Sequence, residues 1–364
     1  MSNEQYVLYN NELKRGIWNM KTTVSVIGAT GYVGAELLRL LEAHPEIEIN
    51  QAVSKNFAGQ KLHDIYASFI PAKPLELADS NSHIPPSDFV FLCLPHGQSL
   101  MMAPALLKSG HKVIDLSGDF RYDNTEIYEK WYGITHTAKK ENAEAIYGLP
   151  EFFRQNISAA NFTSNPGCYT TTGILALAPL LKYGLISEKG IIIDAKSGVT
   201  GAGRKEKLAF SFCETDDNFK AYSVPMHRHT SEIEEQLTKL CGKDICLLFT
   251  PHLLPVKRGI LATIYADIAP DVTPEMVAQA YDECYANEPF THVLPTGQLP
   301  ELKYVVGSNN CMIGYELSPR TGKIIIVSCT DNLIKGAAGQ AIQNFNLMNG
   351  FEETLGLPRT AWYL

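Results

Sequence analysis

The segment TTVSVIGATGYVGAELLRLL, residues 22–41, limits the fold more than any other part of the chain. A β-branched run precedes three glycines at G-x-x-G-x-x-G spacing, and leucines at helical spacing follow. Such glycines let a pyrophosphate approach the backbone, and the free N–H groups of the helix start bind it. The pattern predicts a dinucleotide-binding turn; the alternative is a tight turn whose glycines serve packing alone. The cofactor residues expected here are Gly28, Thr30, Gly31, Tyr32, Val33 and Gly34.

The next predicted strand ends at Ser54 and Lys55, where an NAD site usually carries Asp or Glu. A hydroxyl and a cation suit a ribose 2′-phosphate, so we expect NADP(H) as the cofactor. An ordinary solvated loop lysine is the alternative for Lys55. Strand-like segments at 88–99 and 111–122 continue the α/β alternation, and ligands collect at the carboxyl ends of parallel strands. This rule adds Pro95 to the cofactor site and makes His96, Ser117, Asp119 and Arg121 candidates to line it, with capping and turn roles as the alternative for His96 and Asp119.

Length and charge bound the class of protein. A chain of 364 residues with 45% hydrophobic residues is too long for one ordinary core, so we expect two domains. The net charge of −8, without long runs of one sign, argues against nucleic acid or an anionic membrane as partner. No apolar stretch is long enough to span a bilayer, and no secretory signal opens the chain, which favours a cytoplasmic protein. Residues 1–20 are expected to be an extension outside the fold or a short surface arm.

The eight cysteines include no C-x-x-C pair, so we expect reduced thiols and no zinc site. Cys168 follows an Asn-Pro-Gly turn and precedes an apolar helical run, which places it at the start of a helix. A helix N-terminus or an imidazolium lowers the pKa of a thiol, and His227 and His229 flank Arg228 before another helix. The alternatives are a buried structural cysteine and histidines that cap a helix or bind metal. Too few ligands stand beside H-x-H for a metal site.

The second half of the chain has a different pattern. A strand is expected at 191–195, and segments 246–256, 258–268 and 322–332 alternate with period two, which predicts a mixed or antiparallel sheet. The change near residue 165 predicts a first domain over 21–165 and a second over 166–332. A helical face after Asn332 is expected to return to the first domain, so that 333–364 complete it and Asn332 reaches the cleft.

Nine motifs then occur in register, from GATGYVGAELLRLL through LPHGQS, DLSGDFR, YGLPE, NPGCYTT, SGVTGAGR, HRHTSEIE and FTPHLLPVKRGILATIY to DNLIKGAAGQAIQN. Together they resemble the N-acetyl-γ-glutamyl-phosphate reductase family, related to aspartate-semialdehyde dehydrogenase, from about Lys21 to the C-terminus. The resemblance implies a Rossmann domain followed by an α+β catalytic domain of the glyceraldehyde-3-phosphate dehydrogenase type. It also implies a homo-oligomer, dimer or tetramer. Thr170 and Ser231 stand where the family usually has proline, which removes no chemical group.

The family chemistry implies roles for individual residues. Cys168 would attack an acyl phosphate, expel phosphate and form a thioester that NADPH reduces to the semialdehyde, a step of arginine biosynthesis. His227 or His229 would be the acid/base. The resemblance adds Ser197, Gly198 and Asn332 to the cofactor site, and Asn165, Arg121, Arg204, Arg228 and Arg258 to the substrate site. The alternatives are aspartate-semialdehyde dehydrogenase or another acyl-phosphate reductase, and a non-catalytic NADP(H)-binding sensor. The acyl cap, acetyl or succinyl, stays open.

Overall fold

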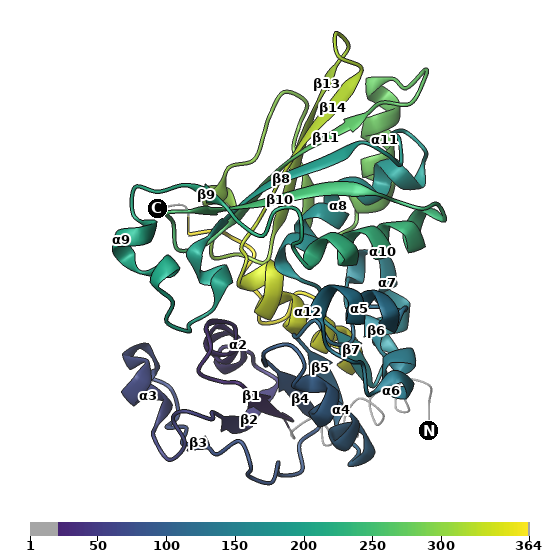
Figure 1. The fold of residues 1–364 in the computed structure, drawn as a ribbon. Helices are drawn as coiled ribbons and strands as arrows, with labels where there is room; N and C mark the ends of the chain where they lie inside the picture. The colour runs from purple at the N-terminus through teal and green to yellow at the C-terminus, as the bar shows by residue number, and fades with distance from the viewer. Residues whose placement is uncertain (1–20, 363–364) are drawn as a thin grey trace, which may run out of the picture.

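A computed structural model describes residues 21–362 and arranges them around two seven-stranded sheets (Figure 1). The expected extension at 1–20 lies outside the described residues. Among residues 21–362, no helix has the length and apolar character needed to cross a membrane. Both predicted layers, the Rossmann-like sheet and the mixed sheet, are confirmed.

The first sheet is parallel throughout, in the order β3-β2-β1-β4-β5-β7-β6. Its central strand is short and apolar, with Val24 and Val26 fully buried because helices cover both faces. The strands are β1 (Thr22–Ile27), β2 (Ile47–Val53), β3 (Leu77–Ala78), β4 (Phe89–Leu92), β5 (Lys112–Asp115), β6 (Ile146–Tyr147) and β7 (Phe162–Ser164). The helices between them are α2 (Tyr32–Glu42), α3 (Leu62–Ile65), the 3₁₀ turn η1 (Ala67–Phe69), α4 (Ser99–Lys108), α5 (Thr125–Tyr132), α6 (Lys139–Glu144) and α7 (Pro150–Ser158).

The second sheet is mixed, in the order β12-β13-β14-β11-β8-β10-β9. Its strands β10 and β8 pair in parallel, whereas β11 pairs antiparallel with both β8 and β14. Burial alternates along β10 and β11, so one face of the sheet packs on helices and the other is more open. The strands are β8 (Ile191–Gly198), β9 (Lys220–Ala221), β10 (Leu247–Leu254), β11 (Ile260–Asp267), β12 (Thr291–Val293), β13 (Cys311–Ser318) and β14 (Lys323–Thr330).

The helices of this half are α8 (Cys168–Lys182), α9 (Phe212–Thr215), α10 (His229–Cys241) and α11 (Pro274–Tyr285), with 3₁₀ turns η2 (Val199–Ala202), η3 (Leu208–Phe210) and η4 (Leu302–Tyr304). Helix α8 is almost wholly buried, and residues such as Leu175 and Leu177 fill the core beneath the mixed sheet. Its first residue is Cys168, as the sequence predicts. The fold therefore holds that cysteine on a rigid element, at the end of the helix that faces the first sheet.

After β14 the chain returns to the first sheet through the π-helical turn η5 (Ile334–Ala338) and the helix α12 (Gly339–Asn349). Ile334, Ala341 and Phe345 are fully buried in the core of the first sheet, together with Leu37 and Phe89. In Figure 1 this yellow segment lies between the two sheets. The residue ranges of the two domains stay a prediction.

Candidate active site

A cleft of about 1070 Å³ lies between the carboxyl ends of the first sheet's strands and the start of α8. The structure brings most of the predicted site residues to its walls. Those lining it are Gly28, Thr30, Gly31, Tyr32, Val33, Gly34, Ser54, Lys55, Pro95, His96, Arg121, Asn165, Cys168, Arg204, Arg228, His229 and Asn332. Six candidate residues lie outside the lining: Ser117, Asp119, Ser197, Gly198, His227 and Arg258.

The three glycines of the turn between β1 and α2 have different surroundings: two are tightly packed and one has space for a ligand. Gly28 has a positive φ of 86°, and a Cβ there would lie 2.2 Å from the Cys93 carbonyl oxygen. A Cβ on Gly34 would lie 2.3 Å from the Gly28 oxygen, whereas at Gly31 the nearest atom is 3.6 Å away. Gly31 caps α2, and within the described part of the chain this cap has no side-chain hydrogen bond and the first turn has no acidic residue. The free N–H groups of this helix start therefore face the cleft, as a pyrophosphate requires.

Positive side chains gather at the Ser54 end of the cleft. Ser54 is buried, and its hydroxyl lies 2.7 Å from the Thr30 hydroxyl, while Lys55 is exposed. Arg204 reaches this end from the loop after η2 and donates a 3.0 Å hydrogen bond to the Thr30 carbonyl. Its guanidinium also stacks over Tyr66, 4.8 Å from the ring centroid. Arg204, predicted at the substrate, thus makes its contacts where the cofactor's ribose is expected.

The opposite end of the cleft holds Cys168, half-buried at the first position of α8. The preceding residue, Gly167, is tightly packed. A Cβ at this position would lie 2.5 Å from His229 Nε2 and 2.9 Å from an Arg121 nitrogen. On another side, a Cβ on Gly336 would lie 2.8 Å from the Cys168 Cβ. An imidazole and a guanidinium therefore lie beside Gly167, and the η5 turn lies against Cys168.

Burial shifts the pKa values of the thiol and of both imidazoles. Burial raises the pKa of the Cys168 thiol to about 11, and this outweighs the Tyr169 N–H and Arg121, which lower it. Burial likewise lowers the pKa of His227 to about 4. The pKa of His229 lies well below 6.5 because of its burial and because His227 and Arg121 are close to it. These pKa directions favour a neutral thiol beside neutral imidazoles in the free protein.

The two histidines have different surroundings. His229 lines the cleft, and its buried Nδ1 has no hydrogen-bond partner among residues 21–362. His227 Nδ1 accepts a 3.2 Å hydrogen bond from the His229 backbone N–H, and its ring packs edge-on against Tyr169 and Phe249. His227 thus supports the backbone of His229, and of the two histidines only His229 lines the cleft.

A buried ion pair that the sequence analysis missed stands behind the cysteine. Arg121 pairs with Glu232 at 3.0 Å, and its other nitrogens donate to the Asn165 and Leu116 carbonyls. Glu232 also accepts hydrogen bonds of 2.9 Å from the Gly167 N–H and from the Tyr147 hydroxyl. Glu232 lies three residues after His229 in the motif HRHTSEIE, which was the only signal in the sequence.

Arg258 and Arg228, the two remaining arginines predicted at the substrate, have different surroundings. Arg258 is outside the cleft lining, paired with Glu36 at 2.5 Å and stacked over Trp362. Arg228 is exposed in the cleft, 5.0 Å from the Tyr132 ring centroid, and the ion pairs of residues 21–362 do not include it. Arg228 is therefore the better placed of the two for a substrate anion.

Polar residues before α4 and after β5 shape the cleft wall. His96 lines the cleft, and its Nδ1 accepts a 2.9 Å hydrogen bond from the Gly118 N–H, while burial lowers its pKa to about 3. Asp119 accepts from the N–H groups of Gly97 and Ser99 and from the Tyr128 hydroxyl. These contacts give Asp119 the turn role named as its alternative. No group of three metal-binding side chains occurs within the described residues.

Comparison with known proteins agrees with this architecture. A family model for the NAD-binding domain of semialdehyde dehydrogenases matches residues 23–160, and one for their dimerisation domain matches residues 168–332. Aspartate semialdehyde dehydrogenase II from Vibrio cholerae, solved in complex with ASA, has a similar fold, with a TM-score of 0.69 and 17% identity over 91% of this chain and 98% of that one.

Curated relatives are much closer in sequence. The chain is 47% identical to N-acetyl-gamma-glutamyl-phosphate reductase from Pelotomaculum thermopropionicum, over 94% of this chain and 100% of the relative. It is 48% identical to the enzyme of that name from Acetivibrio thermocellus, over 94% and 99%. With this identity along nearly its whole length, and with a cysteine, an imidazole and a nucleotide-binding turn on one cleft, the chain belongs to the semialdehyde dehydrogenases, in the N-acetyl-gamma-glutamyl-phosphate reductase family.

Proposed function

We propose that the chain uses NADPH to reduce N-acetyl-γ-glutamyl phosphate to N-acetylglutamate semialdehyde and phosphate, as a step of arginine biosynthesis. The observation that carries the proposal is the position of Cys168, at the start of α8 on the cleft, with His229 Nε2 beside the preceding residue. The names of the curated relatives supply the substrate. The turn at Gly31 at the other end of the same cleft supplies the place for a dinucleotide.

The first step starts from a neutral pair. His229 takes the proton of the Cys168 thiol, and the sulfur attacks the acyl carbon of the substrate. The bond from that carbon to the phosphate oxygen breaks, its electron pair goes to the oxygen, and phosphate leaves with a proton taken from water, so that a thioester remains on Cys168. The N–H groups at the start of α8 and the Arg121 guanidinium stabilise the negative charge that develops here.

The residues of the cleft fit a phosphorylated dinucleotide. The open helix start at Gly31 suits the pyrophosphate, and Ser54, Lys55 and Arg204 suit the 2′-phosphate. When bound, NADPH supplies the hydride that reduces the thioester carbon. His229 holds the proton taken from the thiol beside the reacting oxygen, and as the carbon–sulfur bond breaks, the electron pair returns to sulfur and the proton to Cys168.

The substrate's second anion needs a cation that is not already neutralised. Arg121 is paired with Glu232 and Arg258 with Glu36, whereas Arg228 is exposed on the cleft wall. We assign Arg228 to a substrate anion, with Asn165 beside it on the wall of the same cleft. Removal of the Arg228 charge should raise KM for the substrate more than it lowers kcat.

The reverse reaction tests the proposal directly. N-acetylglutamate semialdehyde, phosphate and NADP⁺ are mixed with the protein, and the absorbance of reduced nicotinamide is followed. N-succinylglutamate semialdehyde and aspartate semialdehyde are run at the same concentrations. The proposal expects the highest kcat/KM with the N-acetyl compound. A higher value with aspartate semialdehyde would assign the chain to the related dehydrogenase activity, and no activity with any aldehyde would leave a nucleotide-binding sensor.

We further propose a homo-oligomer, dimer or tetramer, that works in the cytoplasm. The match of residues 168–332 to a dimerisation domain supports the first part. All eight cysteines are free thiols, which is typical of a reducing compartment and supports the second. Light scattering after size-exclusion chromatography should give at least twice the mass of the chain, and a monomer at working concentration would contradict the assembly.

A further inference from the structure

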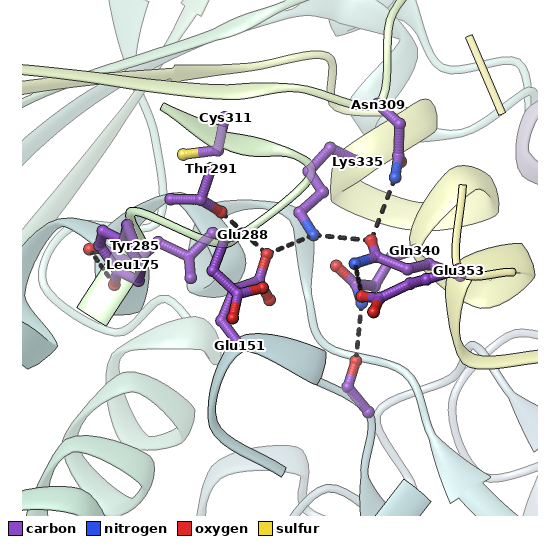
Figure 2. Close-up of polar contacts among 12 residues, drawn as sticks. Glu151, Leu175, Tyr285, Glu288, Thr291, Asn309, Cys311, Lys335, Gln340 and Glu353 are labelled. Carbon is purple, nitrogen blue, oxygen red and sulfur yellow. Dashed lines mark hydrogen bonds and ion pairs between the residues drawn. The ribbon is translucent and has the colours of Figure 1, made fainter. Parts of the chain in front are cut away.

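The fold contains a fully buried ion pair that the reaction does not use. Lys335 Nζ lies 2.7 Å from Glu151 Oε1, and both side chains have zero exposure. Figure 2 shows Lys335 pointing toward Glu151, with Thr291 directed at the same carboxylate from another side. Burial raises the pKa of Glu151, but Lys335 beside it holds that pKa below its ordinary value, so the carboxylate is charged.

Lys335 belongs to the η5 turn, the segment that forms the wall beside Cys168. The turn is π-helical: the Gly336 N–H donates to the Asp331 carbonyl at 2.9 Å, and the Ala338 N–H donates to the Leu333 carbonyl at 2.8 Å. Residues on one side of this turn line the cleft, namely Asn332, Leu333, Gly336 and Ala337. Lys335 is outside that lining and is directed to Glu151 instead. Wide turns of this kind occur most often at functional sites.

The partners of Lys335 come from distant parts of the chain. Glu151 stands in the first turn of α7 and accepts a 2.8 Å hydrogen bond from Thr291, the first residue of β12. Lys335 also donates to Gln343 of α12 at 2.8 Å, and Gln343 donates to Glu353 at 2.7 Å. The network therefore fixes η5 against elements of both sheets and against the segment after α12.

Stability alone is a weak explanation for such a pair. Taking two charges out of water costs several kcal/mol each, and a well-packed apolar pair of similar volume is often as stable. What an apolar pair does not supply is direction, because a charged hydrogen bond fixes both the distance and the angle between its partners. Here the fixed object is a turn whose Gly336 lies against the thiol carbon of Cys168.

We propose that Lys335 is a positioning residue for the hydride-transfer step: its bond to Glu151 sets the distance and rotation of η5, and so the place of the cofactor's nicotinamide relative to Cys168. The inference rests on the proposed role of Cys168. A displacement of about 1 Å in a reacting geometry can lower a rate about 100-fold, so a small shift of η5 is sufficient.

The test separates position from stability. Lys335→Met and Glu151→Met each leave one buried charge unpaired, and both should lower Tm and kcat. The double variant Lys335→Met/Glu151→Met replaces the pair by apolar contact. We expect it to recover Tm while kcat stays about 10- to 100-fold below the wild-type value, with KM for NADPH changed much less. The matched control is Arg154→Met at the outer end of the network, where loss of the Glu288 and Glu353 pairs should lower Tm and leave kcat unchanged.

Recovery of kcat together with Tm in the double variant would overturn the proposal, because the pair would then serve folding alone. If the double variant does not fold, Thr291→Val provides the test of positioning. This variant removes one hydrogen bond to Glu151 and keeps both charges of the pair. A fall in kcat at unchanged KM supports positioning, and an unchanged kcat contradicts it. The role of Cys168 is read separately from Cys168→Ser, so its failure would not be confused with that of Lys335.

Discussion

Glu232 accepts a hydrogen bond of 2.9 Å from the backbone N–H of Gly167, the residue directly before Cys168. The same carboxylate pairs with Arg121 at 3.0 Å. One buried side chain thus fixes both the start of α8 and the cation beside the thiol.

The Glu232→Gln variant should separate thiol acidity from catalysis. Glu232 raises the pKa of the Cys168 thiol and Arg121 lowers it, so loss of the carboxylate charge should lower that pKa and speed alkylation by iodoacetamide at pH 8. Turnover should fall, by about 10-fold or more, because Arg121 loses its buried partner and shifts. Alkylation rate and kcat are measured on the same preparation; if both fall together, Glu232 acts on the fold alone.

The Gly336→Ala variant should slow turnover without unfolding the protein. A methyl group would lie 2.8 Å from the Cys168 Cβ, closer than packing allows, so either Cys168 or η5 moves. We expect kcat to fall by about 10- to 100-fold. Gly173→Ala, on α8, is the control, because its nearest neighbours are flexible ends of Ile193 and Ile233 at 3.4 and 3.6 Å. Equal kcat in the two variants would contradict the tight contact.

The pH dependence of alkylation should report a neutral thiol. With a folded pKa of about 11, Cys168 is thiolate at pH 7 in only about one molecule in ten thousand. Iodoacetamide should therefore label it about tenfold faster for each pH unit from 7 to 10. Peptide mapping must follow Cys168 separately, because Cys213 and Cys246 are exposed. Cys168→Ser should abolish both this labelling and turnover, with NADPH binding retained; a rate that is flat above pH 7 would indicate a preformed thiolate–imidazolium pair.

Acid should destabilise the protein through its buried imidazoles. The folded pKa values of His96, about 3, and His227, about 4, lie below the ordinary value, so below pH 6.5 the unfolded chain binds more protons and stability falls as pH falls toward 4. Asp115 and Glu235, whose pKa values burial raises to about 6 and about 7, act in the opposite sense. The comparison is therefore between wild type and His227→Gln. Between pH 6 and 4, the slope of unfolding free energy against pH should decrease in the variant by the amount that corresponds to the uptake of about one proton on unfolding. Equal slopes would mean that His227 is protonated in the fold.

Cofactor selectivity should depend on the cations at the Ser54 end of the cleft. NADPH should bind more tightly than NADH in a fluorescence titration, because Lys55 and Arg204 are available to a 2′-phosphate. Lys55→Asp should narrow or reverse this gap. Arg204→Met should weaken NADPH more than NADH. Equal affinity of the unmodified protein for the two cofactors would contradict the assignment.

The elements that could be predicted from the sequence are those determined by residues close together in the chain. The strand, glycine turn and helix at 22–42 are adjacent along the chain, and the turn before Cys168 marks the start of α8 at the observed residue. Period-two alternation likewise predicted β10, β11 and β14, and the apolar run at 191–195 predicted β8. Strand β13 was missed because Gly314 and the polar residues near its end weaken the alternation.

Long-range electrostatics could not be predicted in the same way. Arg121 and Glu232 are 111 positions apart, and Arg258 and Glu36 are 222 apart, so no local pattern connects either pair. Arg258 and Arg204 therefore looked like substrate ligands, although one pairs with Glu36 and the other contacts the cofactor end of the cleft. The charge of His229 was also beyond the sequence, because it depends on how deeply the imidazole is buried among Arg121 and His227.

The return of the chain through η5 and α12 determines when the first core can form during synthesis. The parallel sheet is built from residues 22–164, but Ile334, Ala341, Phe345 and Leu357 fill part of its interior. A growing chain has made every strand of this sheet long before it makes those residues. The apolar face of the first sheet that these residues cover therefore stays exposed until the whole mixed sheet has been translated. A chain that terminates between residues 165 and 333 would be a nucleotide-binding half with an incomplete core, and chaperones and proteases would recognise its exposed apolar surface.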